Sequence, residues 1–334
     1  MPLPDPTGPH RVGVIEADVP ARTEAGVVPV VVYYPAIDEP DAPPSTALCG
    51  ATSSDPEQLR WLDSNYAAAL GKSHLTGTLG AWSAGALMGN LGPAATNYEV
   101  VRAAVGADAK APPTNGWPVA VFSHSLTGWR HVNSSLCAEL ASHGAVVIHM
   151  EHADGTACLC TSSEDGRVLA EYVDWAREKT DELKRTTDDV GAALEAWRRA
   201  QVNQRVDEIT AALDGLEKIV GVSTRTSSNV AVLGQSFGGA AAVACCARDA
   251  RFSHCCVYDP WLDGVGPHRH PLPDADYQGK FFPALKRLAL WSCGASPLQE
   301  SCGANWDAIL AKAGPISVRH HEEKAGHFAQ TDAP

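Results

Sequence analysis

The chain has 334 residues, of which 45% are hydrophobic, and a net charge of −13 at pH 7. This length and apolar content are sufficient for one large α/β domain with a substantial core. The acidic balance excludes nucleic acid as an expected partner, because binding to phosphates depends on Lys and Arg. The N-terminal segment lacks the features of a signal peptide and no apolar run approaches the ~18 residues of a membrane span, so a cytoplasmic protein is expected.

The cysteines are placed as small core residues. Cys245 and Cys246 lie in an alanine-rich run, and Cys255 and Cys256 lie in an apolar, strand-like run. The CLC segment at 158–160 has no second pair at the spacing of zinc ligands. The sequence therefore predicts reduced thiols, no disulfide framework and no metal site.

The first part of the chain contains one clear strand signal. Residues 27–34, VVPVVVYY, form a β-branched run that Pro35 ends. The following segment, 36–113, is rich in Pro, Gly, Ala and Ser and has weak periodicity. We expect it to be an irregular segment that covers the core.

A strand, helix, strand alternation begins after this segment. Residues 119–122 predict a buried strand, 132–142 a helix that Gly144 ends, and 145–150 a second strand. The charged segment 168–220 carries its apolar residues at helical spacing, so it predicts a helical excursion from the sheet.

The sheet pattern resumes near residue 229. The expected elements are a strand at 229–234, a helix at 239–247 and further strands at 255–259, 288–293 and 316–320. Strands that alternate with helices in this way are typical of a parallel sheet. The sequence therefore predicts an α/β fold in which helices cover both faces of a mostly parallel central sheet.

The motif Gly-x-Ser-x-Gly stands at the junction of the 229–234 strand and the helix that follows. In VLGQSFGGAAAV, Ser236 is flanked by Gly234 and Gly238, and the helix opens on small residues. This context is typical of the nucleophile elbow of α/β hydrolases, where a sharp turn presents a serine at the N-terminus of a helix. We therefore predict that Ser236 is a nucleophile.

A serine nucleophile needs a histidine base and an orienting carboxylate, and in α/β hydrolases the acid and then the histidine follow the serine. His327 lies a few residues past the last predicted strand, next to a glycine, and is the expected base. For the acid, Asp259 and Glu300 both follow strands, with Asp263 as a weaker choice, and spacing leaves the three open.

The oxyanion hole of this fold takes one backbone N–H from the residue after the nucleophile, here Phe237, and one from a loop after an earlier strand. The segment FSHSLTG follows the 119–122 strand, and its Ser125 or Leu126 is expected to supply the second donor. His124 precedes the serine in the chain, so we interpret it as a polar residue that shapes this loop.

Beyond the elbow, a series of segments resembles the platelet-activating factor acetylhydrolase family, the α/β-hydrolase group that contains the plasma enzyme and its intracellular relative. The similar segments occur in family order between about residues 7 and 329, and they include TGPHRVG, VVYYPA, ALMGN, VFSHSLTGWR, ELASHGAVVIHMEHADGTA, QVNQRVDEI, LGQSFGGAA, RFSHCCVYDPWLDG and GHFA. This is a far more specific signal than the elbow alone.

The resemblance implies a triad of Ser236, Asp259 and His327, with Leu126 and Phe237 as the oxyanion donors. It favours Asp259 because VYDPWLDG matches the family's strand-end aspartate. It also implies hydrolysis of the sn-2 acetyl or short, oxidised acyl chain of a phosphatidylcholine-type lipid, with no cofactor.

Three features differ from the family pattern. The chain has Gln235 where the family usually has the histidine of Gly-His-Ser, and Ser125 where the family usually has the glycine of Ser-His-Gly. The surroundings of ALMGN are rich in small residues, so at most weak contact with a membrane surface is expected. Family members also continue beyond the histidine, whereas this chain stops seven positions after His327, so less support is expected for its loop.

Two other functions remain open at this stage. The same scaffold suits a general short-chain carboxylesterase that acts on esters other than phospholipids, because a fold does not fix a substrate. A binding protein that retains the fold without catalysis is the third hypothesis.

Overall fold

The computed structural model describes residues 5–37, 64–74, 104–105, 109–221, 230–262, 286–293, 306–307, 309–311, 314–325 and 327. Most of the 36–113 segment, including ALMGN at 86–90, therefore lies outside the described residues. Within that segment the structure has a helix, α1 (Ser64–His74), and a short strand, β3 (Ala104–Val105). The expectation of an irregular segment is thus wrong at these two places.

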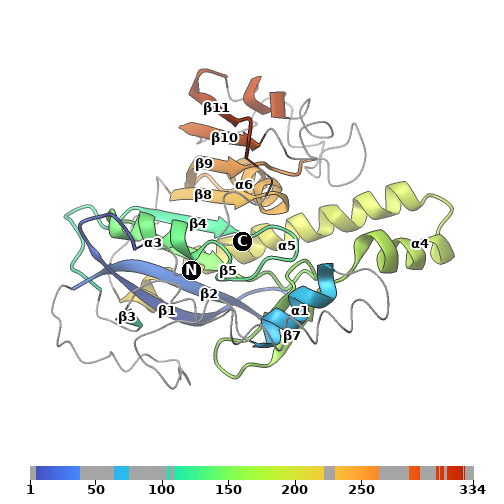
Figure 1. Ribbon diagram of the computed structural model, residues 1–334, viewed down its shortest axis with the longest axis horizontal. Coiled ribbons are helices and arrows are strands. Elements are labelled where there is room, and N and C mark those ends of the chain that lie inside the picture. Colours follow the sequence, from blue (N-terminus) through green and yellow to red (C-terminus); the bar gives the residue numbers. More distant parts are fainter. Residues whose placement is uncertain are drawn as a thin grey trace.

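Nine strands of the described chain form one sheet in the order β11-β10-β9-β8-β4-β5-β2-β1-β3. Figure 1 shows the sheet running from the blue strands β1 and β2 to the red strands β10 and β11. From β5 to β11 every neighbouring pair is parallel, whereas β2 pairs antiparallel with both β5 and β1. The prediction of a mostly parallel sheet is confirmed.

Apart from β1, the main strands of the sheet lie close to where the sequence predicts them. Their bounds are β1 (Arg11–Pro20), β2 (Val27–Ala36), β4 (Val119–Ser123), β5 (Val146–Met150), β8 (Val230–Gln235), β9 (Phe252–Tyr258), β10 (Arg287–Cys293) and β11 (Ser317–Glu322). The sequence analysis missed β1, because Glu16 and Asp18 interrupt its apolar pattern. The Glu16 carboxylate belongs to a polar network described below, and the Asp18 carboxylate accepts hydrogen bonds from Ser162 and Ser163.

Side chains of successive strand residues alternate between two apolar layers. Val30 and Val32 of β2 belong to one buried cluster, and Val31 and Tyr33 to the other. The first cluster contains residues of α5 (Val190–Val220) and α6 (Phe237–Arg248), and the second contains residues of α1 and α3 (Ser134–Ser142). Helices therefore cover both faces, which explains why the central strands are apolar throughout.

The 168–220 segment is only partly the helical excursion that its charge pattern predicts. Its first residues form β7 (Val168–Glu171), which pairs with β6 (Leu159–Thr161) in a separate two-stranded sheet. Helix follows as a π-helical turn at Trp175–Lys179, then α4 (Thr180–Thr186) and the 31-residue α5. The short strand was missed because helical spacing further along the segment dominated its pattern.

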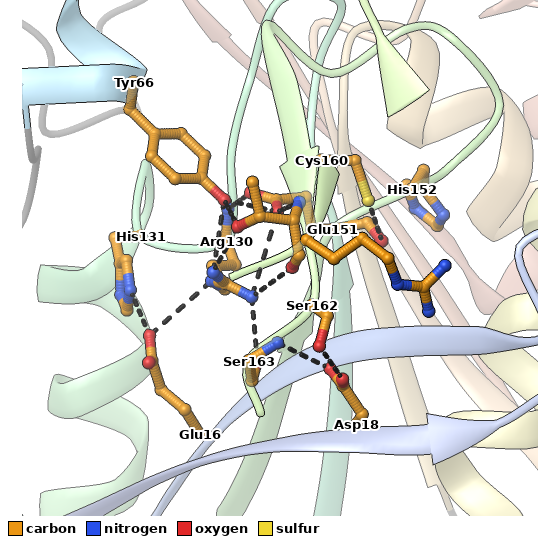
Figure 2. A network of polar contacts seen from close by, with 12 residues as sticks. Glu16, Asp18, Tyr66, Arg130, His131, Glu151, His152, Cys160, Ser162 and Ser163 are labelled. Carbon is orange, nitrogen blue, oxygen red and sulfur yellow. Dashed lines mark hydrogen bonds and ion pairs between the residues drawn. The ribbon is translucent and has the colours of Figure 1, made fainter. Parts of the chain in front are cut away.

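A polar network centred on Arg130 ties the sheet to α1 and β6 (Figure 2). The Glu151 carboxylate accepts hydrogen bonds from the Tyr66 hydroxyl at 2.6 Å and the Thr161 backbone N–H at 3.0 Å. The Arg130 guanidinium donates to the Thr161 carbonyl at 3.0 Å and lies 3.6 Å from a Glu16 oxygen. The carboxylate of Glu16 thus connects β1 to this network.

Among the described helices, none combines the length and the apolar surface needed to cross a bilayer. The longest, α5, carries buried Arg and Glu side chains instead.

The Glu16 carboxylate gives a prediction for acid stability. Burial raises its pKa, but the charge of Arg130 and a hydrogen bond with His131 outweigh burial and lower the pKa from 4.5 to about 2. A depressed pKa in the folded state contributes stability above the unfolded value, and this contribution is lost as pH falls toward 2. Glu16→Gln should therefore destabilise the protein at neutral pH.

Urea unfolding of wild type and Glu16→Gln between pH 7 and 3 tests this prediction. The difference in unfolding free energy should be constant at neutral pH and shrink as pH falls below about 4.5. A difference that grows on acidification would contradict the role assigned to Glu16.

Candidate active site

Ser236 occupies a strained turn between β8 and α6. Its backbone has φ 52° and ψ −119°, a left-handed conformation that L-residues rarely adopt. The side chain caps no helix N–H, and the residue is 5% exposed. The elbow predicted from the motif is therefore present in the backbone, and its serine lies at the N-terminus of α6.

Three glycines make this turn possible. A Cβ at Gly234 would clash with the backbone of Gly238, and a Cβ at Gly238 would clash with the carbonyl oxygens of Ser123 and His124. At Gly239 a Cβ would lie 2.6 Å from the Cβ of Pro260. Because no side chain fits at these positions, the elbow packs directly against the ends of β4 and β9.

Asp259 and His327 lie in direct contact. The Nδ1 atom of His327 is 2.5 Å from Oδ2 of Asp259, whose Oδ1 accepts the backbone N–H of Cys293 at 3.1 Å. Asp259 follows β9, is fully buried and has φ 44°. Each carboxylate oxygen thus has a partner, and these two contacts fix the orientation of the Asp259 carboxylate toward the imidazole. Glu300 and Asp263, the alternative acids, lie outside the described residues.

Gln235 connects the elbow to the histidine loop. Its Nε2 donates to the backbone carbonyl of His327 at 2.9 Å, and its own backbone belongs to β8. In the sequence, Gln235 stands out only as a departure from the family pattern. Since the contact spans 92 positions of the chain, no local pattern could have indicated it. The hydrogen bond from Gln235 supports the loop that carries His327.

The other histidines after Ser236 are engaged elsewhere where they are described. His321 lies 2.9 Å from the Ser292 hydroxyl, and His320 stacks on Trp291 with ring centroids 4.4 Å apart. Nδ1 of His254 lies 2.9 Å from the Ser253 hydroxyl. His268 and His270 lie outside the described residues. Of the described histidines that follow Ser236, His327 is the one whose ring contacts a carboxylate, that of Asp259.

The loop after β4 carries Leu126, the predicted second oxyanion donor. The next residue, Thr127, has φ 58°, and its backbone N–H donates to the Thr156 carbonyl at 2.7 Å. The Cys158 N–H donates in turn to the Gly128 carbonyl at 3.1 Å. Phe237 is the first residue of α6, so its N–H has no partner within the helix. The roles of Leu126 and Phe237 as donors remain predictions.

His124 is fully buried beneath this loop, and its ring shapes the loop as expected. Its Nδ1 lies 2.6 Å from the Ser125 carbonyl, and its Nε2 accepts the backbone N–H of His152 at 3.1 Å. These bonds require the proton on Nδ1. Burial, with the Arg205 charge, lowers the pKa of His124 well below its ordinary value, so the ring is neutral.

Arg205 of α5 holds the same loop from the other side. Its guanidinium donates to the His124 carbonyl at 2.7 Å and to the Ser123 hydroxyl at 3.2 Å, and its Nε donates to Asp154 at 2.8 Å. Arg205 and Asp154 have fully buried side chains. The sequence does not indicate this support, because the charged residues of α5 resemble the exposed face of a solvated helix.

Ser123, His152 and Glu208 form a second Ser, His and carboxylate arrangement. Nε2 of His152 lies 2.8 Å from the Ser123 hydroxyl, and its Nδ1 lies 2.6 Å from Glu208. All three residues are fully buried, and burial is the main cause that raises the pKa of Glu208 to about 8. The Ser123 hydroxyl is bonded to His152 and to Arg205 in the interior, so this set supports the loop after β4.

The strained residues of the described chain gather at this site. Its non-glycine residues with positive φ are Thr127, Ser236 and Asp259. One neighbours the predicted oxyanion donor, one is the predicted nucleophile and one is the predicted acid. Backbone strain of this kind persists where the surrounding structure imposes it, and it is frequent at active sites.

A sequence model described as platelet-activating factor acetylhydrolase, isoform II, matches residues 1–272. The chain belongs to this family. The match contains Ser236 and Asp259 and ends before His327. Family membership confirms the resemblance that the quoted segments indicated.

Among curated relatives, the family enzyme of Cavia porcellus is 29% identical over 164 residues, which is 46% of this chain and 37% of the relative. That of Gallus gallus is 27% identical over 174 residues, covering 46% of this chain and 41% of the relative. The matched part of the chain thus spans less than half of these relatives.

The fold has a solved counterpart in a ferulic acid esterase from Streptomyces cinnamoneus. The TM-score is 0.60 at 19% identity, covering 99% of this chain and 79% of the other. At this identity the similarity supports the α/β-hydrolase fold alone. It agrees with the family's fold as predicted from the sequence.

The strain at Ser236 predicts an unusual order of stabilities. Glycine adopts positive φ without a steric penalty, so Ser236→Gly should be about 1 kcal/mol more stable than Ser236→Ala, after allowance for the flexibility of glycine in the unfolded chain. Urea unfolding of the two variants measures the difference. A Ser236→Gly variant less stable than Ser236→Ala would indicate a relaxed turn.

The Gln235 contact predicts a kinetic effect on the histidine loop. Gln235→Leu removes the N–H donor at similar volume and should lower kcat for a soluble ester by about tenfold, with less effect on KM. Gln235→His retains a ring N–H and serves as the matched control, expected to lose less. Equal losses in the two variants would show that packing, not the hydrogen bond, is important.

Proposed function

We propose that the protein is a serine ester hydrolase that removes the sn-2 acetyl or short, oxidised acyl chain of phosphatidylcholine-type lipids. The contact between His327 and Asp259 carries this proposal, because it joins a base and an acid at the loop that Gln235 holds against the elbow. Family membership supports the lipid substrate.

In the first half of the reaction, Nε2 of His327 accepts the hydroxyl proton of Ser236 while Oγ attacks the ester carbonyl carbon. The backbone N–H groups of Phe237 and Leu126 stabilise the oxyanion. When the tetrahedral intermediate collapses, the bond to the alcohol oxygen breaks and the imidazolium gives its proton to that oxygen. Lysophospholipid leaves, and an acyl-enzyme remains.

In the second half, His327 accepts a proton from water as the water attacks the acyl carbonyl. Collapse returns the proton to the oxygen of Ser236 and releases the carboxylic acid. Asp259 stabilises the imidazolium in both halves and holds Nδ1 protonated, so that Nε2 acts as the base. The N-terminus of α6 adds positive potential where the oxyanion forms.

The substrate assignment is tested with a calcium-free assay in the presence of a chelator. Wild type should release acetate from an sn-2 acetyl phosphatidylcholine-type lipid and act far less on the long-chain counterpart, and Ser236→Ala should do neither. Hydrolysis of a water-soluble short-chain ester without action on either lipid would favour a general carboxylesterase. A folded wild type that resists fluorophosphonate labelling would favour a binding protein.

The role of Asp259 is tested by substitution of the acid. Asp259→Asn retains the size of the side chain but favours the wrong imidazole tautomer, so kcat should fall on the order of 10⁴-fold. Glu300→Gln is the matched control and should have a far smaller effect. A larger loss of kcat in Glu300→Gln than in Asp259→Asn would instead identify Glu300 as the acid.

A further inference from the structure

Arg198 of α5 is a buried cation with unsatisfied hydrogen-bond donors. The residue is 1% exposed, and within the described residues no carboxylate forms an ion pair with it. Its Nη1 donates to the Gln201 side chain at 2.8 Å, whereas Nε and Nη2 have no hydrogen-bond partner. Buried guanidinium groups are ordinarily paired, so this one requires an explanation.

Aromatic rings surround the guanidinium. The distances from its central carbon to the ring centroids are 4.6 Å for Trp197, 5.2 Å for Phe237, and 5.3 Å for both Trp175 and Trp261. Aromatic faces attract a cation and hold the group in place. They do not accept the in-plane N–H groups, so the Nε and Nη2 donors remain without an acceptor.

Two of the rings connect Arg198 to the elbow. Phe237 directly follows Ser236, and the backbone N–H of Trp261 donates to the Ser236 carbonyl at 2.8 Å. The three tryptophans are only partly buried. The guanidinium therefore lies beneath side chains that reach the surface, and it contacts the ring of Phe237, the residue directly after the predicted nucleophile.

The charge around Arg198 is unbalanced in favour of cations. The charge of Asp154 acts on Arg198, but Asp154 is paired directly with Arg205, whose own charge opposes that effect. Burial raises the pKa of Glu208 to about 8, so that carboxyl is largely neutral at pH 7. Burial lowers the pKa of Arg198 to about 10, and the group stays protonated at neutral pH.

We propose that Arg198 determines substrate specificity by binding an anionic oxygen group, carboxylate or phosphate, on the ester substrate through its Nε and Nη2 donors. The planar edge of a guanidinium that carries Nε and one Nη atom matches the two oxygens of such groups. Arg205 provides the contrast within the same helix, since protein acceptors occupy its donors. The inference rests on the proposed ester hydrolysis and adds the chemical class of the ester.

The anionic group has two sources, the acyl chain or the alcohol, and paired substrates separate them. For the acyl side, p-nitrophenyl hemiglutarate is compared with p-nitrophenyl valerate, which has a methyl group in place of the carboxylate. For the alcohol side, 1-alkyl-2-acetylglycerophosphocholine is compared with 1-alkyl-2-acetylglycerol. For each pair, the readout is a ratio of two kcat/KM values: that of the ester that carries the carboxylate or phosphate, divided by that of the ester that lacks it.

Arg198→Gln should lower this ratio by about tenfold or more for at least one pair, and the pair affected identifies the source. Arg198→Lys retains the charge without the planar edge and should give an intermediate ratio. Arg199→Gln is the matched control, because Arg199 is the next residue in the chain, is partly exposed and pairs with Glu195. The ratio measured for the Arg199→Gln variant should stay within about twofold of the wild-type ratio.

A folded Arg198→Gln variant with both ratios unchanged would overturn the proposal. If this variant does not fold, the test uses inhibition of the wild-type enzyme. Monomethyl glutarate or glycerol phosphate should inhibit hydrolysis of the valerate ester competitively. Inhibition by neither compound would overturn the proposal. Hydrolysis of the valerate ester reports catalysis by itself. Wild type that hydrolyses no ester therefore contradicts the proposed function, whereas hydrolysis without Arg198-dependent preference contradicts this inference alone.

Discussion

The close approach of the Ser236 turn to the ends of two neighbouring strands is the constraint on which the site depends. Gly238 lies against the carbonyls of Ser123 and His124, and Gly239 lies against Pro260. Because only hydrogen atoms fit at these positions, the start of α6 reaches the loop of the predicted oxyanion donor on one side and the strand of the predicted acid on the other. The same packing imposes the strained φ of Ser236.

Polar groups buried beneath the site keep its loops in place. Arg205 spans the gap between α5 and the loop after β4, and its bonds to Asp154 and the His124 carbonyl satisfy the guanidinium without solvent. A buried network of this kind is stabilising only when its members are satisfied. Arg198, about two turns before Arg205 on the same helix, does not meet that condition, and this exception lies next to the elbow.

Burial distinguishes the two Ser and His arrangements of the protein. Ser123, His152 and Glu208 have triad-like contacts, but none has exposed surface, and Ser123 also accepts a hydrogen bond from Arg205. Ser236 retains exposed surface and a strained backbone. Side-chain types alone would therefore name two candidate nucleophiles, and the exposed surface of Ser236 favours it over Ser123.

The sequence by itself determined the sheet, the elbow and the family, because each depends on a local pattern: β-branched runs for the strands of the sheet, small residues around Ser236, and quoted segments in family order. It left the acid open on spacing alone, and it missed β1, β7 and α1, where interleaved charges or weak periodicity hide the pattern. Only the tertiary structure placed His327 against Asp259, tied its loop to Gln235, and buried Arg198 among aromatic rings. These contacts join residues far apart in the chain, so their geometry depends on how strands and helices pack and not on the order of residues within any one segment.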